Sequence, residues 1–99
     1  DLAAVGALAR SRGILSLIDN SYASPLLQRP AEFGIDLIAH SATKYLNGHS
    51  DVVAGVLCGS ERLLRDVFQG PYITLGAILG PFEAWLMLRG LRTLELRMQ

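Results

Sequence analysis

The stretch IDLIAHSATKYLNGHSDVVAGVLC, residues 35–58, decides the fold of this chain. It contains two apolar runs of strand-like composition, residues 35–40 and 51–58. The segment between them is too short for the helical crossover that joins parallel strands. We therefore predict that these two strands pair antiparallel. The polar cluster Ser41-Ala42-Thr43-Lys44 follows the first strand, and residues 45–50 form a loop.

On the N-terminal side, a helix and a strand precede this stretch. Apolar residues at i, i+3, i+4 spacing predict a helix over 2–12, which Gly13 ends. The apolar run 14–18 then predicts a buried parallel strand that ends at Asp19. Residues 24–30 hold about one turn of helix, because a proline closes the segment. A helix that leads into a buried strand indicates an α/β layer.

On the C-terminal side, the pattern predicts two helices, over 62–69 and over 82–98. Gly70-Pro71 is expected to break the first helix. The second has apolar residues on every side, Trp85 among them, so we expect it to be buried between layers or between subunits. Cys58 lies in a strand-like run and is expected to be a small core residue. The whole pattern predicts an α/β fold, a mostly parallel sheet with one antiparallel strand and flanking helices.

Composition excludes several classes of function. The chain has 99 residues and 10.7 kDa, which suits one domain. Nine basic and nine acidic residues cancel, so no overall charge attracts nucleic acid. No run approaches the roughly 18 apolar residues of a membrane span. The first residues resemble no signal peptide, and one cysteine cannot form an internal disulfide, so a cytoplasmic location is expected.

Chemistry that needs a side-chain amine has one candidate, because Lys44 is the only lysine. Lys44 and Asp19 both follow predicted strands, and ligands of open α/β sheets bind at the carboxyl ends of strands. A lysine leaving an apolar strand loses hydration, which favours the neutral amine that attacks a carbonyl. Ser41 and Thr43 add hydroxyls for a phosphate. A phosphate anchor, a carboxylate and an amine together indicate pyridoxal 5'-phosphate (PLP) as cofactor.

This assignment carries a geometric condition. In an extended strand Ser41 and Thr43 would face one side and Lys44 the other, because side chains alternate. The backbone must therefore leave the strand near residue 41 for all three to reach one ligand.

Three stretches resemble a known family of PLP enzymes. They are IDNSYASPLLQRP (18–30), HSATKYLNGHSDVVAG (40–55) and PFEAWLMLRGLRTLELRM (81–98). They look like the Cys/Met-metabolism group, which includes cystathionine γ-synthase, cystathionine γ-lyase, methionine γ-lyase and the O-acetylhomoserine sulfhydrylases. The resemblance implies that residues 1–99 are part of the PLP-binding large domain of a fold-type-I enzyme, without its N-terminal part and C-terminal small domain. Both ends of the chain are accordingly expected to be cut.

The resemblance also implies a role for each site residue. Lys44 would form the Schiff base with PLP, and Asp19 would bind the protonated pyridine nitrogen. Ser41 and Thr43 would hold the phosphate, and Ser21 would lie near the ring. The implied activity is γ-elimination or γ-replacement on an amino-acid substrate, either a sulfur amino acid or an O-acyl-homoserine. Complete members of the family associate as homodimers or homotetramers.

Other interpretations of the same residues stay open. Lys44 could be an ordinary surface lysine, and Asp19 could serve only to cap the loop that follows it. The chain could be a catalytically silent fragment that binds PLP weakly or not at all. His40, His49 and Cys58 match no zinc spacing, so no metal site is expected. His40 is expected to pack near the strand end, and His49 to order its loop.

Overall fold

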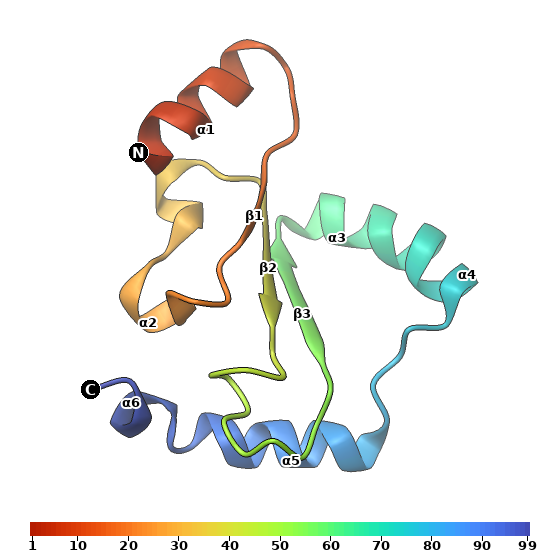
Figure 1. Ribbon diagram of the computed structural model, residues 1–99. Coiled ribbons are helices and arrows are strands. Elements are labelled where there is room, and N and C mark those ends of the chain that lie inside the picture. The colour runs from red at the N-terminus through yellow and green to blue at the C-terminus, as the bar shows by residue number, and fades with distance from the viewer.

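Three short strands form one mixed sheet in the computed structural model, which describes residues 1–99 (Figure 1). The strands are β1 (Leu17–Asp19), β2 (Leu37–Ser41) and β3 (Gly55–Gly59), in the order β1-β2-β3. β1 and β2 are parallel, and β2 and β3 are antiparallel. The antiparallel pairing predicted from the short connection is confirmed.

Helical segments flank the sheet in the order expected for an α/β fragment. They are α1 (Leu2–Ser11), α2 (Ser24–Leu27), the 3-10 turn η1 (Pro30–Phe33), α3 (Glu61–Val67), the π turn η2 (Phe68–Tyr72), α4 (Ile73–Leu75), α5 (Pro81–Leu91) and α6 (Leu94–Arg97). None of the helices has the length and the apolar character that crossing a lipid bilayer requires.

The first strand begins later than predicted, because the Ile14 N–H closes α1 and the Ser16 N–H donates to a side chain instead of a neighbouring strand. Gly13 adopts a left-handed conformation with φ of 62°, and the Ile14 N–H donates to the Ala9 carbonyl at 2.9 Å. This bond closes the helix in a Schellman motif. The strand begins at Leu17, after Ser16 has bonded to the Asp36 carboxylate through its N–H (2.9 Å) and its hydroxyl (2.7 Å).

The C-terminal helices also differ from the prediction. Gly70-Pro71 does not break the helix, since the chain continues through the π turn η2 into α4 and ends at Gly76, whose φ is 67°. The helix predicted over 82–98 is interrupted at Thr93, which has φ of −112° and ψ of 4°. The interruption places the side chain of Leu94 in the core.

The hydrophobic core lies between the β2–β3 connection and the C-terminal helices, as Figure 1 shows for α5 beneath that connection. Its six buried residues are Ala42, Leu46 and Val52 from the connection and Leu86, Met87 and Leu94 from α5 and α6. The segment that carries Lys44 therefore rests directly on α5 and α6. Their packing determines where that segment sits.

Two burial predictions are wrong, those for the strand over 14–18 and for Cys58. The strand is not buried, since Ile14, Leu15 and Leu17 are each 60–62% exposed. Cys58 is exposed on the edge strand β3. In the helix predicted over 82–98, Trp85 is 60% exposed, because only one face of α5 packs against the connection while its other face is uncovered. Burial between layers of this chain is therefore not found, and burial between subunits stays a prediction.

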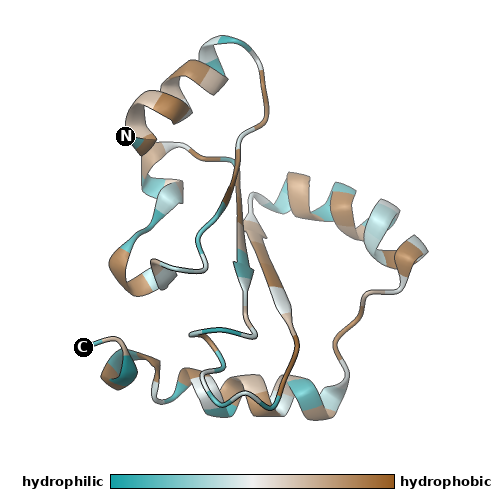
Figure 2. Cartoon of the chain, in the orientation of Figure 1, coloured by the Kyte–Doolittle hydropathy of each residue, from teal (hydrophilic) through white to brown (hydrophobic).

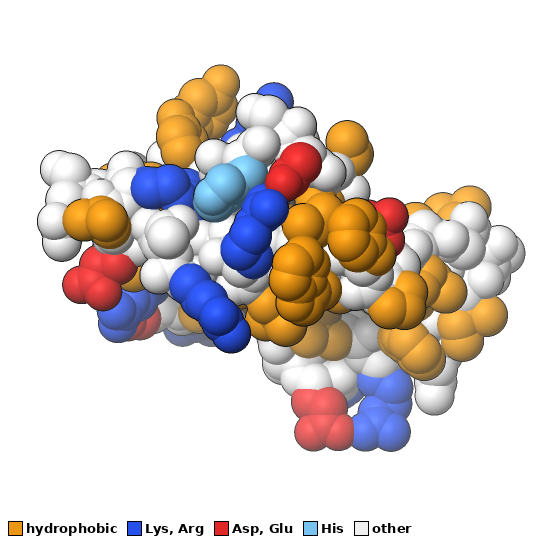
Figure 3. Space-filling view, turned by 90° about the horizontal axis from the view of Figure 1, so that it is seen from below, with side chains coloured by type: hydrophobic (Ala, Val, Ile, Leu, Met, Phe, Trp, Pro, Cys, Tyr) orange, Lys and Arg blue, Asp and Glu red, His pale blue; other side chains and the backbone are white.

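Apolar residues are not confined to the core. Figure 2 shows hydrophobic residues along most helices and strands, and Figure 3 shows apolar side chains gathered at the surface.

Candidate functional site

A cavity of about 950 Å³ lies beyond the carboxyl ends of β1 and β2. All five predicted site residues line it: Asp19, Ser21, Ser41, Thr43 and Lys44. The structure thus brings together residues from two strand ends and one turn. Tyr22 and Ser50, which the sequence analysis missed, line the same cavity. Only their proximity to Ser21 and Lys44 in the sequence could have indicated them.

The backbone leaves β2 where the site requires it. β2 ends at Ser41, whose carbonyl accepts the Lys44 N–H at 3.1 Å. The Asn47 N–H donates to Ala42 (3.0 Å) and the Gly48 N–H to Lys44 (2.8 Å). These bonds wind residues 42–48 into a turn. Strand alternation therefore stops at Ser41, and the geometric condition for a shared site is met.

Ser21 joins the ends of the two parallel strands. Its N–H (2.9 Å) and its hydroxyl (2.5 Å) both donate to Oδ1 of Asp19. The same hydroxyl accepts the Ser41 N–H at 2.6 Å. Asp19 thus caps its loop, as one interpretation of the sequence held, while its Oδ2 has no hydrogen-bond partner within the chain. That oxygen is available to a ligand in the cavity.

These bonds favour the ionised form of Asp19. The Ser21 hydroxyl, and next the Ser21 N–H, lower the pKa of the Asp19 carboxyl, because both stabilise its charged form. Asp19 is therefore a carboxylate at neutral pH. A fixed carboxylate of this kind holds a protonated ring nitrogen well.

Replacing Ser21 by alanine should raise the pKa of Asp19 toward its ordinary value, because the hydroxyl that stabilises the carboxylate is lost. Ser21→Thr keeps a hydroxyl and should keep the lowered pKa. Carbon-13 NMR titration of the aspartate carboxyl carbons measures both. An unchanged pKa of Asp19 in Ser21→Ala would contradict this assignment.

The two predicted phosphate ligands differ in availability. The Thr43 hydroxyl accepts the Ala54 N–H at 2.9 Å and donates to the Ala54 carbonyl at 3.2 Å. The Thr43 N–H also donates to that carbonyl, at 3.1 Å. Thr43 therefore holds the turn against the start of β3. The Ser41 hydroxyl has no such partner and is free to donate to a ligand.

Lys44 lines the cavity with an exposed side chain that makes no ion pair. The loss of hydration expected for it is not found. The reason is local: β2 ends at Ser41, so Lys44 sits on the turn rather than in the apolar strand. The exposed amine is free to meet a ligand.

The two histidines lie near the site without forming a metal centre. His40 is buried on β2, as expected for packing near the strand end. His49 Nδ1 lies 2.6 Å from the Asn47 carbonyl oxygen within its own loop. No group of three or more His, Cys, Asp or Glu side chains is placed to hold a metal ion.

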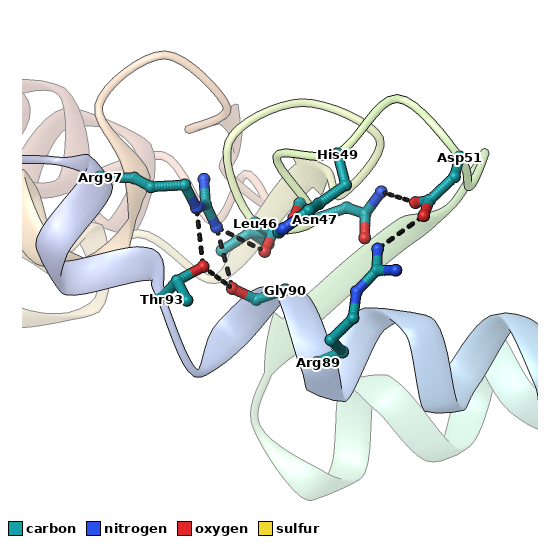
Figure 4. A network of polar contacts seen from close by, with 8 residues as sticks. All are labelled: Leu46, Asn47, His49, Asp51, Arg89, Gly90, Thr93 and Arg97. Atoms are coloured by element: carbon teal, nitrogen blue, oxygen red, sulfur yellow. Dashed lines mark hydrogen bonds and ion pairs between the residues drawn. The ribbon is translucent and has the colours of Figure 1, made fainter.

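An ion pair joins Asp51, which also lines the cavity, to Arg89 of α5 (Figure 4). Arg89 donates to Asp51 at 2.6 Å, and the Asn47 side-chain amide donates to the other Asp51 oxygen at 2.8 Å. Both contacts lower the pKa of Asp51: the hydrogen bond from the Asn47 amide is the largest cause, and the hydrogen bond from Arg89 is the next. No pattern in the sequence indicates this pair, since Asp51 and Arg89 are far apart along the chain.

Comparison with known proteins finds one family. The model of the Cys/Met metabolism PLP-dependent enzymes matches residues 1–99. L-Methionine gamma-lyase of Pseudomonas putida is 48% identical over 99% of this chain, and cystathionine beta-lyase of Coxiella burnetii is 44% identical over all of it. These matches cover 25% and 26% of the two relatives. The chain therefore spans about a quarter of the length of the relatives that it matches.

Solved structures give the same result. Cystathionine gamma synthase from Xanthomonas oryzae pv. oryzae, in complex with aminoacrylate and cysteine, superposes with a TM-score of 0.90 at 46% identity, over 97% of this chain and 25% of that one. Cystathionine gamma-lyase from Lactobacillus plantarum, complexed with L-serine, superposes with a TM-score of 0.89 at 42% identity, over 96% and 25%. The fold of this chain is thus that of a quarter of these enzymes.

Proposed function

Because this chain belongs to the Cys/Met metabolism family of PLP-dependent enzymes, we propose that its protein acts on sulfur amino acids or O-acyl-homoserine by γ-elimination or γ-replacement. Residues 1–99 are, in this proposal, part of the PLP-binding large domain. One observation supports it most: Asp19, Ser41 and Lys44 line one cavity, and each has a polar atom free for a ligand.

Each of these residues suits one part of PLP. Asp19 is an ionised carboxylate that holds a proton on the pyridine nitrogen. Ser41 donates its hydroxyl to the phosphate. Lys44 would bind the aldehyde carbon through Nζ as the Schiff-base lysine, with loss of water, and its amine would serve to move protons at the substrate carbons. When bound, PLP supplies an electron sink for the substrate α-carbon.

Borohydride trapping tests the role of Lys44. PLP is added to the protein, the adduct is reduced, and mass spectrometry locates the pyridoxyl group. Within this chain Lys44 is the only side-chain amine, so we expect the group on Lys44 and an absorption band at about 420 nm before reduction. Lys44→Ala should lose both signals. A pyridoxyl group found elsewhere, or none at all, would refute the proposal.

Ser41→Ala should weaken PLP binding about tenfold, because a charge-assisted hydrogen bond contributes roughly 1.5 kcal/mol or more. Ser50→Ala is the matched control, since Ser50 lines the same cavity without an assigned role. Equilibrium dialysis with PLP measures both dissociation constants. Equal affinities for Ser41→Ala and the unaltered protein would place the phosphate elsewhere.

We propose that residues 1–99 by themselves bind PLP without turnover. Lys44 and Asp19 are both exposed here, so the cavity does not exclude water from the reacting groups. The complete protein should release a 2-oxo acid from a sulfur amino acid, and residues 1–99 alone should release none. A cytoplasmic location belongs to the same proposal. So does assembly as a homodimer or homotetramer, which the uncovered apolar face of α5 supports.

A further inference from the structure

Arg97, at the end of α6, binds the backbone of the turn that carries Lys44 (Figure 4). Its Nη1 donates to the Tyr45 carbonyl at 2.7 Å, and its Nη2 lies 3.4 Å from the Leu46 carbonyl. These are the two residues that follow Lys44. The guanidinium therefore contacts the turn immediately next to the only lysine.

The turn has carbonyl groups that its own backbone leaves unpaired. The Ser41, Ala42 and Lys44 carbonyls accept N–H groups from within the turn. The Tyr45 and Leu46 carbonyls would need the N–H groups of residues 49 and 50, as in a longer helix, but the chain turns away at Gly48. Arg97 supplies donors in their place, as a cationic side chain does at a helix C-terminus.

Arg97 is itself held in a fixed position. Its Nη2 also donates to the Gly90 carbonyl at 2.9 Å, and its Nε donates to the Thr93 hydroxyl at 3.0 Å. The planar guanidinium thus joins α5, α6 and the turn at once. Lysine carries a single ammonium and cannot reproduce this fork of donors.

Gly48 leaves the space that the guanidinium occupies. It has φ of 70°, and a Cβ there would collide with the Arg97 guanidinium. This feature is independent of the hydrogen bonds described above. It indicates that the turn and the arginine fit one another closely.

We propose that Arg97 is a positioning residue for Lys44. By pairing the Tyr45 and Leu46 carbonyls, it holds the turn in the shape that presents Nζ to the cavity. This inference rests on the proposed attachment of PLP to Lys44. Arg97 itself does not line the cavity, so its effect passes through the backbone of the turn.

The test separates positioning of Lys44 from general damage to the site. PLP-free protein is mixed with PLP, and the rate of covalent attachment is followed by the absorption band and by borohydride trapping. Affinity for pyridoxamine 5'-phosphate is measured in parallel, because this analogue lacks the aldehyde and cannot bond to Lys44. Arg97→Met and Arg97→Lys are compared with Arg92→Met, an exposed arginine near the end of α5.

Arg97→Met should slow attachment about tenfold and leave pyridoxamine 5'-phosphate affinity within about twofold, since a small misplacement of a reacting group costs rate. Arg92→Met should match the unaltered protein. If Arg97→Met does not fold, Arg97→Lys provides the test. We expect PLP to attach to Lys44 several-fold more slowly in that variant than in the unaltered protein. Unaltered attachment rates in the folded Arg97 variants would overturn the inference. Equal losses of attachment rate and of pyridoxamine 5'-phosphate affinity would also overturn it. No attachment in the unaltered protein would instead refute the proposed function.

Discussion

Asp19→Asn should leave PLP on Lys44, its proposed point of attachment, and lower turnover of the complete protein on the order of 100-fold. Asparagine keeps the side-chain oxygen that accepts the two Ser21 bonds, so the loop keeps its shape. It lacks the negative charge that holds a proton on the pyridine nitrogen. The cofactor would then bind and react with the lysine but accept electrons poorly.

Steady-state kinetics measure turnover, and the absorption band shows whether PLP stays attached to Lys44. Asp36→Asn is the matched control, because Asp36 also accepts an N–H and a hydroxyl from one serine, Ser16, at the other end of the same strands. Ser16 lowers the pKa of Asp36, so its charge adds stability that is lost as pH falls below about 4. Asp36→Asn should therefore lower stability near neutral pH, differ little from the unaltered protein in acid, and leave turnover unchanged. Full turnover by Asp19→Asn would remove Asp19 from the mechanism.

Gly90→Val should lower the free energy of unfolding by about 4 kcal/mol. Gly90 is buried where α5 crosses beneath the site loop. A Cβ there would collide with the Asn47 carbonyl oxygen and lie 2.8 Å from the Asn47 Cα. Those atoms belong to the backbone, so relief requires the loop or the helix to move. The gain in helix propensity over glycine, under about 1 kcal/mol, is too small to offset this clash.

Denaturant unfolding of the complete protein measures the loss, and PLP affinity should fall with it because the displaced loop carries Lys44. Gly70→Val is the control, since a Cβ at Gly70 meets nothing within 4 Å. It should cost less than about 1 kcal/mol. Equal stability of Gly90→Val and Gly70→Val would show that Gly90 is not in close contact with the Asn47 backbone.

Local features of the sequence were enough to predict which residues gather at the strand ends and how β2 and β3 pair. The short connection between residues 40 and 51 forced β2 and β3 to pair antiparallel. Asp19 and Lys44 follow strand ends, and parallel strands bring such ends to one edge of the sheet, where both line the cavity. The family resemblance rested on the same contiguous motifs, and the comparison with the family confirms it.

Contacts between distant segments could not be predicted from the sequence. No spacing rule pairs Arg97 with the Tyr45 carbonyl or Thr43 with Ala54, because these partners meet only when the helices and the turn pack. Periodicity likewise reports that Trp85 and Cys58 are apolar, whereas burial depends on whether another element covers them. Residue type and spacing along the chain therefore determined which groups this protein brings to its site. Tertiary packing alone decided how they are held and how far each is exposed, since both depend on neighbours remote in the sequence.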